Sequence, residues 1–271
     1  MELTWDNVLL AFALTLFAGL STGIGSAIAF LTKKTNKKFL SLSLGFSAGV
    51  MIYVSFVEIF PTAQETLRES YSEKIADVIV AISFFAGMGL IAIIDKLIPS
   101  YENPHEVKSV ECMENNQPHD KKLMRMGIFS ALAIGIHNFP EGLATFIAGL
   151  SNPEIAYPIA FAIAIHNIPE GIAVSVPIFF ATGSRKKAFK LSFLSGLSEP
   201  LGAIIGFFLI YTFIGINSVI LGILFALVAG IMVFISLDEL LPTAKEYGAH
   251  HLSIYGLVAG MVLMAFSLLL F

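Results

Sequence analysis

The sequence predicts an all-α integral membrane protein with eight transmembrane helices. Of its 271 residues, 56% are hydrophobic and only 13% are charged, about half the charged share of a soluble domain. Eight apolar stretches are each long enough to cross a hydrocarbon core of about 30 Å, which takes about 20 helical residues. They are too long for barrel strands and do not alternate as such strands do. A net charge of −4 gives no reason to expect a nucleic-acid partner.

The apolar stretches set the expected helix boundaries. No basic region precedes the first stretch, so we interpret it as a retained helix rather than a cleaved signal peptide. The second and seventh helices are expected to end near Pro61 and Pro242, because proline interrupts helical hydrogen bonding. The whole chain, 1–271, is expected to form one transmembrane domain with a polar cytoplasmic loop over about 98–124. The eight predicted helices are 7–31, 39–60, 76–97, 125–149, 155–182, 189–212, 217–241 and 252–271.

Basic residues predict the orientation, because Lys and Arg are enriched in cytoplasmic loops. With the N-terminus outside the cell membrane, all but two of the 16 Lys and Arg residues fall on the cytoplasmic side. Only Arg68 and Lys74 remain outside. We therefore expect both termini outside, and an odd number of spans would break this pattern.

Three pairs of segments in the chain resemble each other. In the predicted topology they pair helix four with five, two with seven, and one with six, and the members of each pair run in opposite directions. This is a 3 + 2 + 3 inverted repeat, an arrangement typical of transporters whose related halves alternate around a central site. The paired segments are 131–142 with 160–171, 48–63 with 229–244, and 16–30 with 193–207.

The fourth and fifth helices carry the same string, His-Asn-x-Pro-Glu-Gly. In each copy the His and the Glu are four residues apart, so they share one side of a helix. The sixth helix adds a central glutamate. Ionisable groups at membrane depth usually face a cavity or a partner, and the three helix centres contain no Lys or Arg, so a bound cation is expected to supply the compensating charge. The candidate ligands are His137, Asn138, Glu141, His166, Asn167, Glu170 and Glu199.

The types of ligand narrow the choice of cation. Imidazole and carboxylate without thiolate favour zinc, iron(II), manganese, cobalt or nickel over copper(I). The single cysteine, Cys112, excludes an internal disulfide and a cysteine-based zinc module. Pro140 and Pro169 free backbone carbonyls, which membrane proteins tolerate where the backbone lines a cavity. Because only neutral histidine binds metal, transport is expected to fail at low pH.

Other polar residues have two interpretations each. Those that close the second and seventh helices are either entry and exit ligands or ordinary helix-end residues. The two histidines that begin the eighth helix are either an exit relay or a solvated pair, and two serines near Glu199 are either hydrogen-bond donors to the site or packing residues. These residues are Glu58, Asp238, Glu239, His250, His251, Ser195 and Ser198.

Three functions are compatible with such a site. The inverted repeat favours a carrier of divalent metal ions that works by alternating access. A membrane-embedded metal-dependent hydrolase could hold a catalytic zinc ion with the same residues, although the HExxH string typical of such enzymes is absent. A proton- or sodium-coupled transporter of another solute is the third possibility, for which histidine is a less natural ligand.

The whole chain resembles the ZIP (Zrt/Irt-like) metal transporters, bacterial ZupT-like branch. The resemblance rests on HNFPEG at 137–142, HNIPEG at 166–171, SEP at 198–200 and VSFVEIFPTA at 54–63. It implies a transporter rather than an enzyme, with no resident cofactor. It also implies a homodimer in the lipid bilayer that takes up zinc into the cytoplasm, with iron, manganese and cobalt as further cargoes.

The resemblance also implies how the site is arranged. Two metal positions would lie side by side, with Glu141 and Glu170 bridging them. Some relatives have aspartate where this chain has Asn167, so the second position is less anionic here. Helices one, four, five and six would move as a bundle against the other four. The first position would use His137, Glu141, His166 and Glu170, and the second Asn138, Asn167, Glu199 and the two bridging glutamates.

Overall fold

The computed structural model describes residues 5–31, 37–97, 135–136, 138–150, 153–209, 217–247 and 250–269. Every regular element among these residues is helical. Six helices in the described part of the chain are long and apolar enough to cross a membrane. The prediction of an all-α protein with several membrane-spanning helices is therefore confirmed, and the predicted loop at 98–124 lies outside the described residues.

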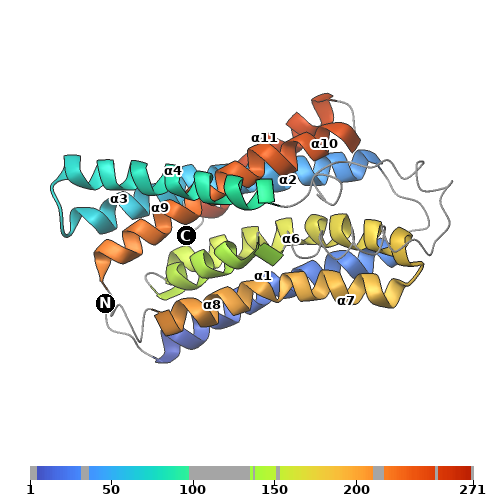
Figure 1. Ribbon diagram of the computed structural model, residues 1–271, viewed down its shortest axis with the longest axis horizontal. Helices are drawn as coiled ribbons and strands as arrows, with labels where there is room; N and C mark the ends of the chain where they lie inside the picture. The colour runs from blue at the N-terminus through green and yellow to red at the C-terminus, as the bar shows by residue number, and fades with distance from the viewer. Residues whose placement is uncertain are drawn as a thin grey trace.

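The helices form two layers, which Figure 1 shows one above the other. In the lower layer, α1 packs against α6, α7 and α8, and a helical segment over 138–150 approaches α8 closely. This layer joins helices that are distant in sequence, which brings both copies of the repeated string together. Its labelled elements are α1 (Trp5–Leu31), α6 (Pro153–Thr182), α7 (Arg185–Gly196) and α8 (Ser198–Leu209).

The upper layer contains the remaining described helices. There α2 packs against α11, and α4 packs against α9, while the two layers meet where α6 contacts α2 and α11. These elements are α2 (Lys37–Val54), η1 (Ser55–Ile59), α3 (Phe60–Arg68), α4 (Glu73–Leu97), α9 (Ser218–Ile235), η4 (Ser236–Leu240), α10 (Leu241–Tyr247) and α11 (His250–Leu269).

Two predicted helix ends, at 60 and 241, differ from the structure. The chain stays helical past both prolines, to Arg68 at the end of α3 and to Tyr247 at the end of α10. In each case a short π-helical turn, η1 or η4, comes directly before the proline-containing helix. A π turn inserts an extra residue and widens the helix, so the proline ring can follow without ending it.

The predicted sixth helix, 189–212, is interrupted once. Leu197 separates α7 from α8, and its backbone N–H donates to the carbonyl oxygen of Phe193. Pro200 lies in the first turn of α8, where the missing N–H is tolerated because first-turn N–H groups have no partner within the helix. The interruption therefore places Glu199 at the start of α8.

Two glycines let α1 and α6 approach to backbone contact. A Cβ atom built on Gly25 would lie 1.9 Å from the carbonyl oxygen of Ile168, and one built on Gly171 would lie 2.0 Å from that of Thr22. Any larger side chain would push the helices apart. Small residues at helix contacts are typical of membrane proteins, and here they fix the part of α6 that carries the second repeated string.

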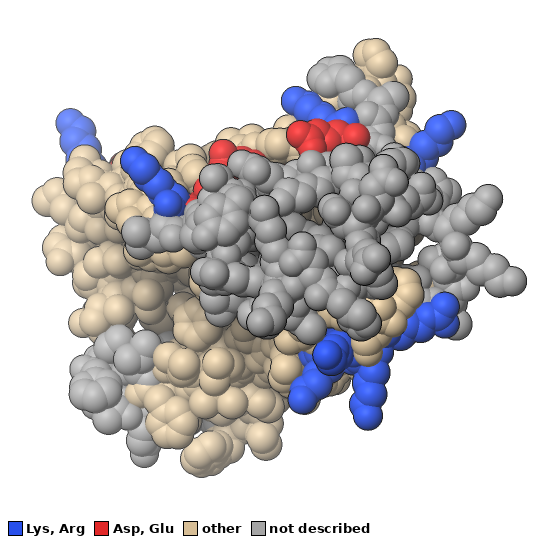
Figure 2. All heavy atoms as spheres, turned by 45° about the vertical axis from the view of Figure 1, so that its right-hand side comes forward, with Lys and Arg blue, Asp and Glu red and all other residues tan. Residues whose placement is uncertain are grey.

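The outward surface is largely apolar. In α4, for example, the exposed fractions of Ile82 and Phe85 are 65% and 66%. In Figure 2, Lys and Arg side chains project mainly from the rim of the molecule, and the described surface between them is mostly uncharged. Such a surface fits the hydrocarbon core of a bilayer, and the protein is a multi-pass membrane protein.

Candidate metal centre

Three elements of the lower layer supply the candidate ligands. The segment 138–150 carries Asn138 and Glu141, α6 carries three further residues, and α8 carries Glu199 in its first turn. His137 lies outside the described residues. All six described candidates are buried, with at most 2% of their surface exposed: Asn138, Glu141, His166, Asn167, Glu170 and Glu199.

A trio of side chains forms the centre of the site. The Nε2 atom of His166 lies 3.2 Å from Oε2 of Glu141 and 3.9 Å from Oε1 of Glu170. One ligand atom from each residue can be chosen so that all three lie within 4.8 Å of one another. The spacing predicted that His166 and Glu170 share one side of a helix, and the packing of α6 against the segment 138–150 adds Glu141. One nitrogen and two carboxylate oxygens at this separation could hold a divalent metal ion.

A second group of polar side chains lies beside Glu199. The Nδ2 atom of Asn167 donates to the carbonyl oxygen of Ala18 at 2.9 Å and to Oε1 of Glu199. Among the described residues, Oδ1 of Asn167 and both amide atoms of Asn138 have no hydrogen-bond partner. A buried polar atom without a partner costs about 1–3 kcal/mol, so these amide oxygens are suited to a cation.

The local charge is negative. The segment 138–150, α6 and α8 contain no Lys or Arg, yet together they bury Glu141, Glu170 and Glu199. His166 is the basic group that contacts the first two. Carboxylates in a medium of low dielectric constant need a compensating charge, and a divalent cation would provide it while using the same oxygens as ligands.

Backbone contacts hold the three elements in place. A Cβ atom built on Gly142 would lie 2.1 Å from the backbone oxygen of Glu199, and one built on Gly202 would lie 2.3 Å from that of Phe139. The glycine that follows Glu141 in the repeated string therefore sets the distance between Glu141 and α8.

Ser47 is a further contact of the site, and the sequence pattern does not predict it. It lies on α2, in the upper layer, and its buried hydroxyl donates to Oε1 of Glu170 at 3.4 Å. No motif surrounds this serine, so only the packing of α2 against α6 brings it to the site. The two serines expected near Glu199 make local bonds instead: Ser195 donates to Ser192 O at 2.7 Å, and Ser198 donates to Ser195 O at 2.6 Å.

The other acidic candidates lie in the two π turns. Glu58 in η1 is half-buried, Glu239 in η4 is buried, and Asp238 beside it is exposed. At the start of α11, His251 is exposed and its ring stacks on Tyr255. Roles for these residues in metal entry or exit stay predictions.

Fold and site together define a class of protein: a multi-pass membrane protein that buries between its helices a cluster of side chains that could hold a metal ion. The chain matches the model of a family described as ZIP zinc transporter over residues 4–95 and 96–268. The chain belongs to this family. The family assignment confirms the predicted resemblance and supports the transporter over the hydrolase.

Similar proteins cover nearly the whole chain. A protein named zinc transporter ZupT from Streptococcus mutans is 66% identical over 266 residues, which cover 98% of this chain and 99% of that protein. Proteins of the same name from Clostridium perfringens and Chlorobium chlorochromatii are 63% and 64% identical. Those alignments cover 98% of this chain and 97% and 99% of the respective relatives.

Proposed function

We propose that this protein carries zinc ions across the cell membrane into the cytoplasm. The observation that supports this most directly is the buried trio of Glu141, His166 and Glu170. Membrane-buried ionisable groups usually serve transport or ligand binding. The names of the similar proteins point to the same cargo. Zinc is transported here as substrate, and the site must therefore release it.

The ligand types agree with reversible binding. Zinc accepts histidine nitrogen and carboxylate oxygen, and sites without cysteine thiolate bind less tightly and exchange more readily. We assign the first metal position to His137, Glu141, His166 and Glu170. We assign the second to Asn138, Asn167 and Glu199, with Glu141 and Glu170 bridging the two. Iron(II), manganese and cobalt use the same donor types and are proposed as further cargoes.

Alternating access would use the two layers. The proposed mobile bundle consists of α1, the segment 138–150, α6, α7 and α8, which pack together as the lower layer. The proposed site faces the other layer, since Ser47 of α2 contacts Glu170. Movement of one layer along the other would expose the site first to one side of the membrane and then to the other.

The proposed topology has eight spans, a 3 + 2 + 3 inverted repeat and both termini outside. Two features support it. The π turns at Ser55–Ile59 and Ser236–Leu240 occupy equivalent positions of one predicted repeat pair. In addition, Figure 1 places the end of α1 and the starts of α2 and α7 at the same end of the molecule, where the basic residues are concentrated in the sequence. We further propose one domain over 1–271 and assembly as a homodimer.

Uptake of radioactive zinc into proteoliposomes tests the proposed function. Glu141→Ala and Glu170→Ala each remove a carboxylate ligand and are expected to lower uptake at least about tenfold. Glu69→Ala removes an exposed carboxylate and is the matched control, expected to transport like the wild type. If both site variants carry zinc at the wild-type rate, the assignment of the site is wrong. If the wild type carries no zinc, the proposed cargo is wrong.

A further inference from the structure

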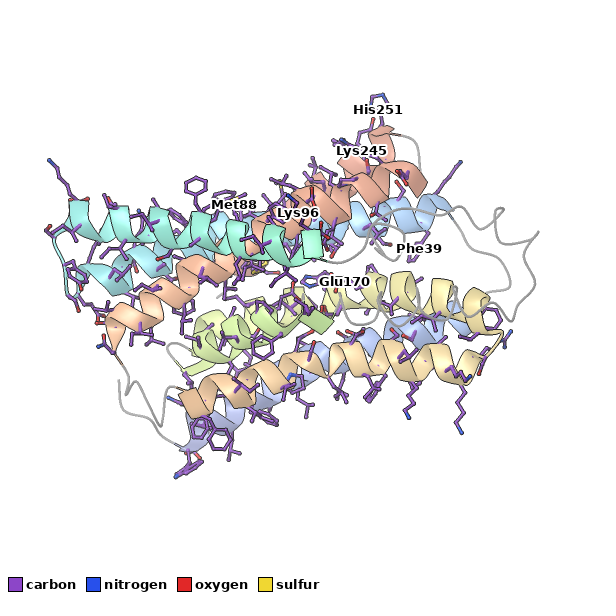
Figure 3. The ribbon with its side chains drawn as sticks, viewed as in Figure 1. Phe39, Met88, Lys96, Glu170, Lys245 and His251 are labelled. Atoms are coloured by element: carbon purple, nitrogen blue, oxygen red, sulfur yellow. The ribbon has the colours of Figure 1, made fainter. Side chains whose placement is uncertain are left out.

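Ser47 connects the metal site to the opposite layer of helices. It lies on α2, none of its surface is exposed, and its hydroxyl donates to Oε1 of Glu170 on α6 at 3.4 Å. Figure 3 shows Glu170 on the side of α6 that faces the upper layer. The same Oε1 atom lies 3.9 Å from Nε2 of His166, so Ser47 contacts the oxygen that is turned towards the other ligands.

Most buried hydroxyls on helices satisfy themselves locally. Ser and Thr commonly donate to the carbonyl one turn earlier on their own helix. In this chain Ser236 donates to Met232 O at 2.7 Å, and Thr145 donates to Glu141 O at 2.9 Å. Ser47 instead donates across the contact between two layers to a carboxylate. Its hydroxyl is therefore placed for a role that local helix packing does not require.

We propose that Ser47 is a positioning residue for zinc binding that acts through Glu170. This inference rests on the proposed function, in which Glu170 is a ligand. A carboxylate can turn about its last side-chain bond, and only some orientations direct Oε1 towards the ion that Glu141 and His166 also bind. A directional hydrogen bond from Ser47 selects one of these orientations before the ion arrives. Groups that orient metal ligands in this way typically contribute about 10- to 100-fold to metal affinity.

The location of Ser47 makes this contribution depend on how the layers are aligned. Ser47 and Glu170 belong to helices of different layers, so a shift of one layer along the other separates the hydroxyl from the carboxylate. Glu170 then loses its fixed orientation, and the ion is held less tightly. The hydrogen bond thus favours zinc capture in the arrangement seen here. Its loss in a shifted arrangement weakens zinc binding and so helps release.

The test compares two serines of α2. Ser47→Ala removes the hydroxyl that contacts Glu170. Ser41→Ala is the matched control, because Ser41 is equally buried on the same helix but donates to Ala244 O of α10 within the upper layer, at 2.6 Å. Ser47→Thr keeps a hydroxyl and is expected to restore most of the wild-type behaviour. Zinc dissociation constants are measured by calorimetry on purified protein, and KM and maximal rate are measured by uptake into proteoliposomes.

We expect Ser47→Ala to raise both the dissociation constant and KM about tenfold, without lowering the maximal rate. Ser41→Ala is expected to stay within about twofold of the wild type. A merely structural role would instead lower the maximal rate or the amount of folded protein. Alanine is the best helix former, so the variant is expected to fold. If its melting shows otherwise, the second measurement is the zinc affinity of the folded fraction alone, isolated by size-exclusion chromatography.

The proposal is overturned if Ser47→Ala and Ser41→Ala have equal zinc affinity and KM, or if Ser47→Thr is as defective as Ser47→Ala. These outcomes can be distinguished from a failure of the proposed function. If the proposed function is wrong, the wild type itself takes up no zinc. If only the proposal for Ser47 is wrong, the wild type still transports zinc.

Discussion

The contact between Gly142 and Glu199 offers a sharp test of how the site is held together. A Cβ atom built on Gly142 would lie 2.1 Å from the backbone oxygen of Glu199, whereas ordinary contact begins at 3.4 Å. In Gly142→Ala the segment 138–150 and α8 must therefore separate by about 1.3 Å, the difference between these two distances. The oxygen belongs to the backbone of a helix, and the Cβ atom is bonded directly to the backbone of another helical segment, so no flexible side chain can absorb the shift.

Two effects follow from this separation. Overpacking of a well-packed interior lowers the free energy of unfolding by about 1–3 kcal/mol. The shift also moves Glu141, the neighbour of Gly142, relative to Glu199. Metal sites require ligand distances within about 0.2 Å of their preferred values, so a displacement several times larger is expected to weaken zinc binding at least about tenfold.

Gly89→Ala is the matched control, because a Cβ atom on Gly89 of α4 would have no neighbour within 4 Å. Alanine is favoured over glycine within a helix by about 0.5–1 kcal/mol, so this variant should melt slightly higher and bind zinc normally. The measurements are thermal melting in detergent and zinc titration by calorimetry. If Gly142→Ala binds zinc as tightly as Gly89→Ala does, the reasoning that this contact sets the site geometry is refuted, whatever its melting temperature.

Two further predictions concern charges inside and outside the site. Asn167→Asp replaces the amide that donates to Ala18 O and Glu199 with a carboxylate beside that of Glu199. We expect this variant to have a lower melting temperature than the wild type without zinc, and a larger increase in melting temperature when zinc is added. Equal zinc-induced increases in the variant and the wild type would contradict this. Arg68 pairs with Asp77 at 2.9 Å, with 39% and 41% of the two side chains exposed. Exposed pairs contribute below about 1 kcal/mol, so Arg68→Ala should melt and transport like the wild type, and a clear loss of uptake would show that this outer pair is linked to transport.

The sequence predicted the part of the site that depends on spacing within one helix. His166 and Glu170 are four residues apart, and the structure places both at one buried centre. It could also predict that Glu141 joins them, because identical strings in two helices suggest a shared site. Ser47 could not be predicted in this way. A serine on α2 has no spacing relation to α6, and only the packing of the two helices reveals their contact.

Proline positions show a second limit of sequence reasoning. In the sequence, proline predicts the end of the second and seventh helices, since it lacks an N–H group and its ring clashes with the carbonyl of the preceding turn. That interpretation assumes an α-helix before the proline. In the structure, the backbone N–H of Phe60 donates to Ser55 O, and that of Leu241 donates to Ser236 O. Both are bonds of the wider π type, which leave room for the ring.

The recurrence of this turn says more than either copy alone. A π turn is rare and costs stability, so a single one could be an accident of packing. Here the same device occurs at Ser55–Ile59 and at Ser236–Leu240, in two segments that the sequence pairs as repeats. Each turn also carries a glutamate, Glu58 or Glu239, in front of its proline. An insertion that shifts the helix register in both copies keeps the two helices alike in shape. Two halves that exchange roles around a central site need such likeness.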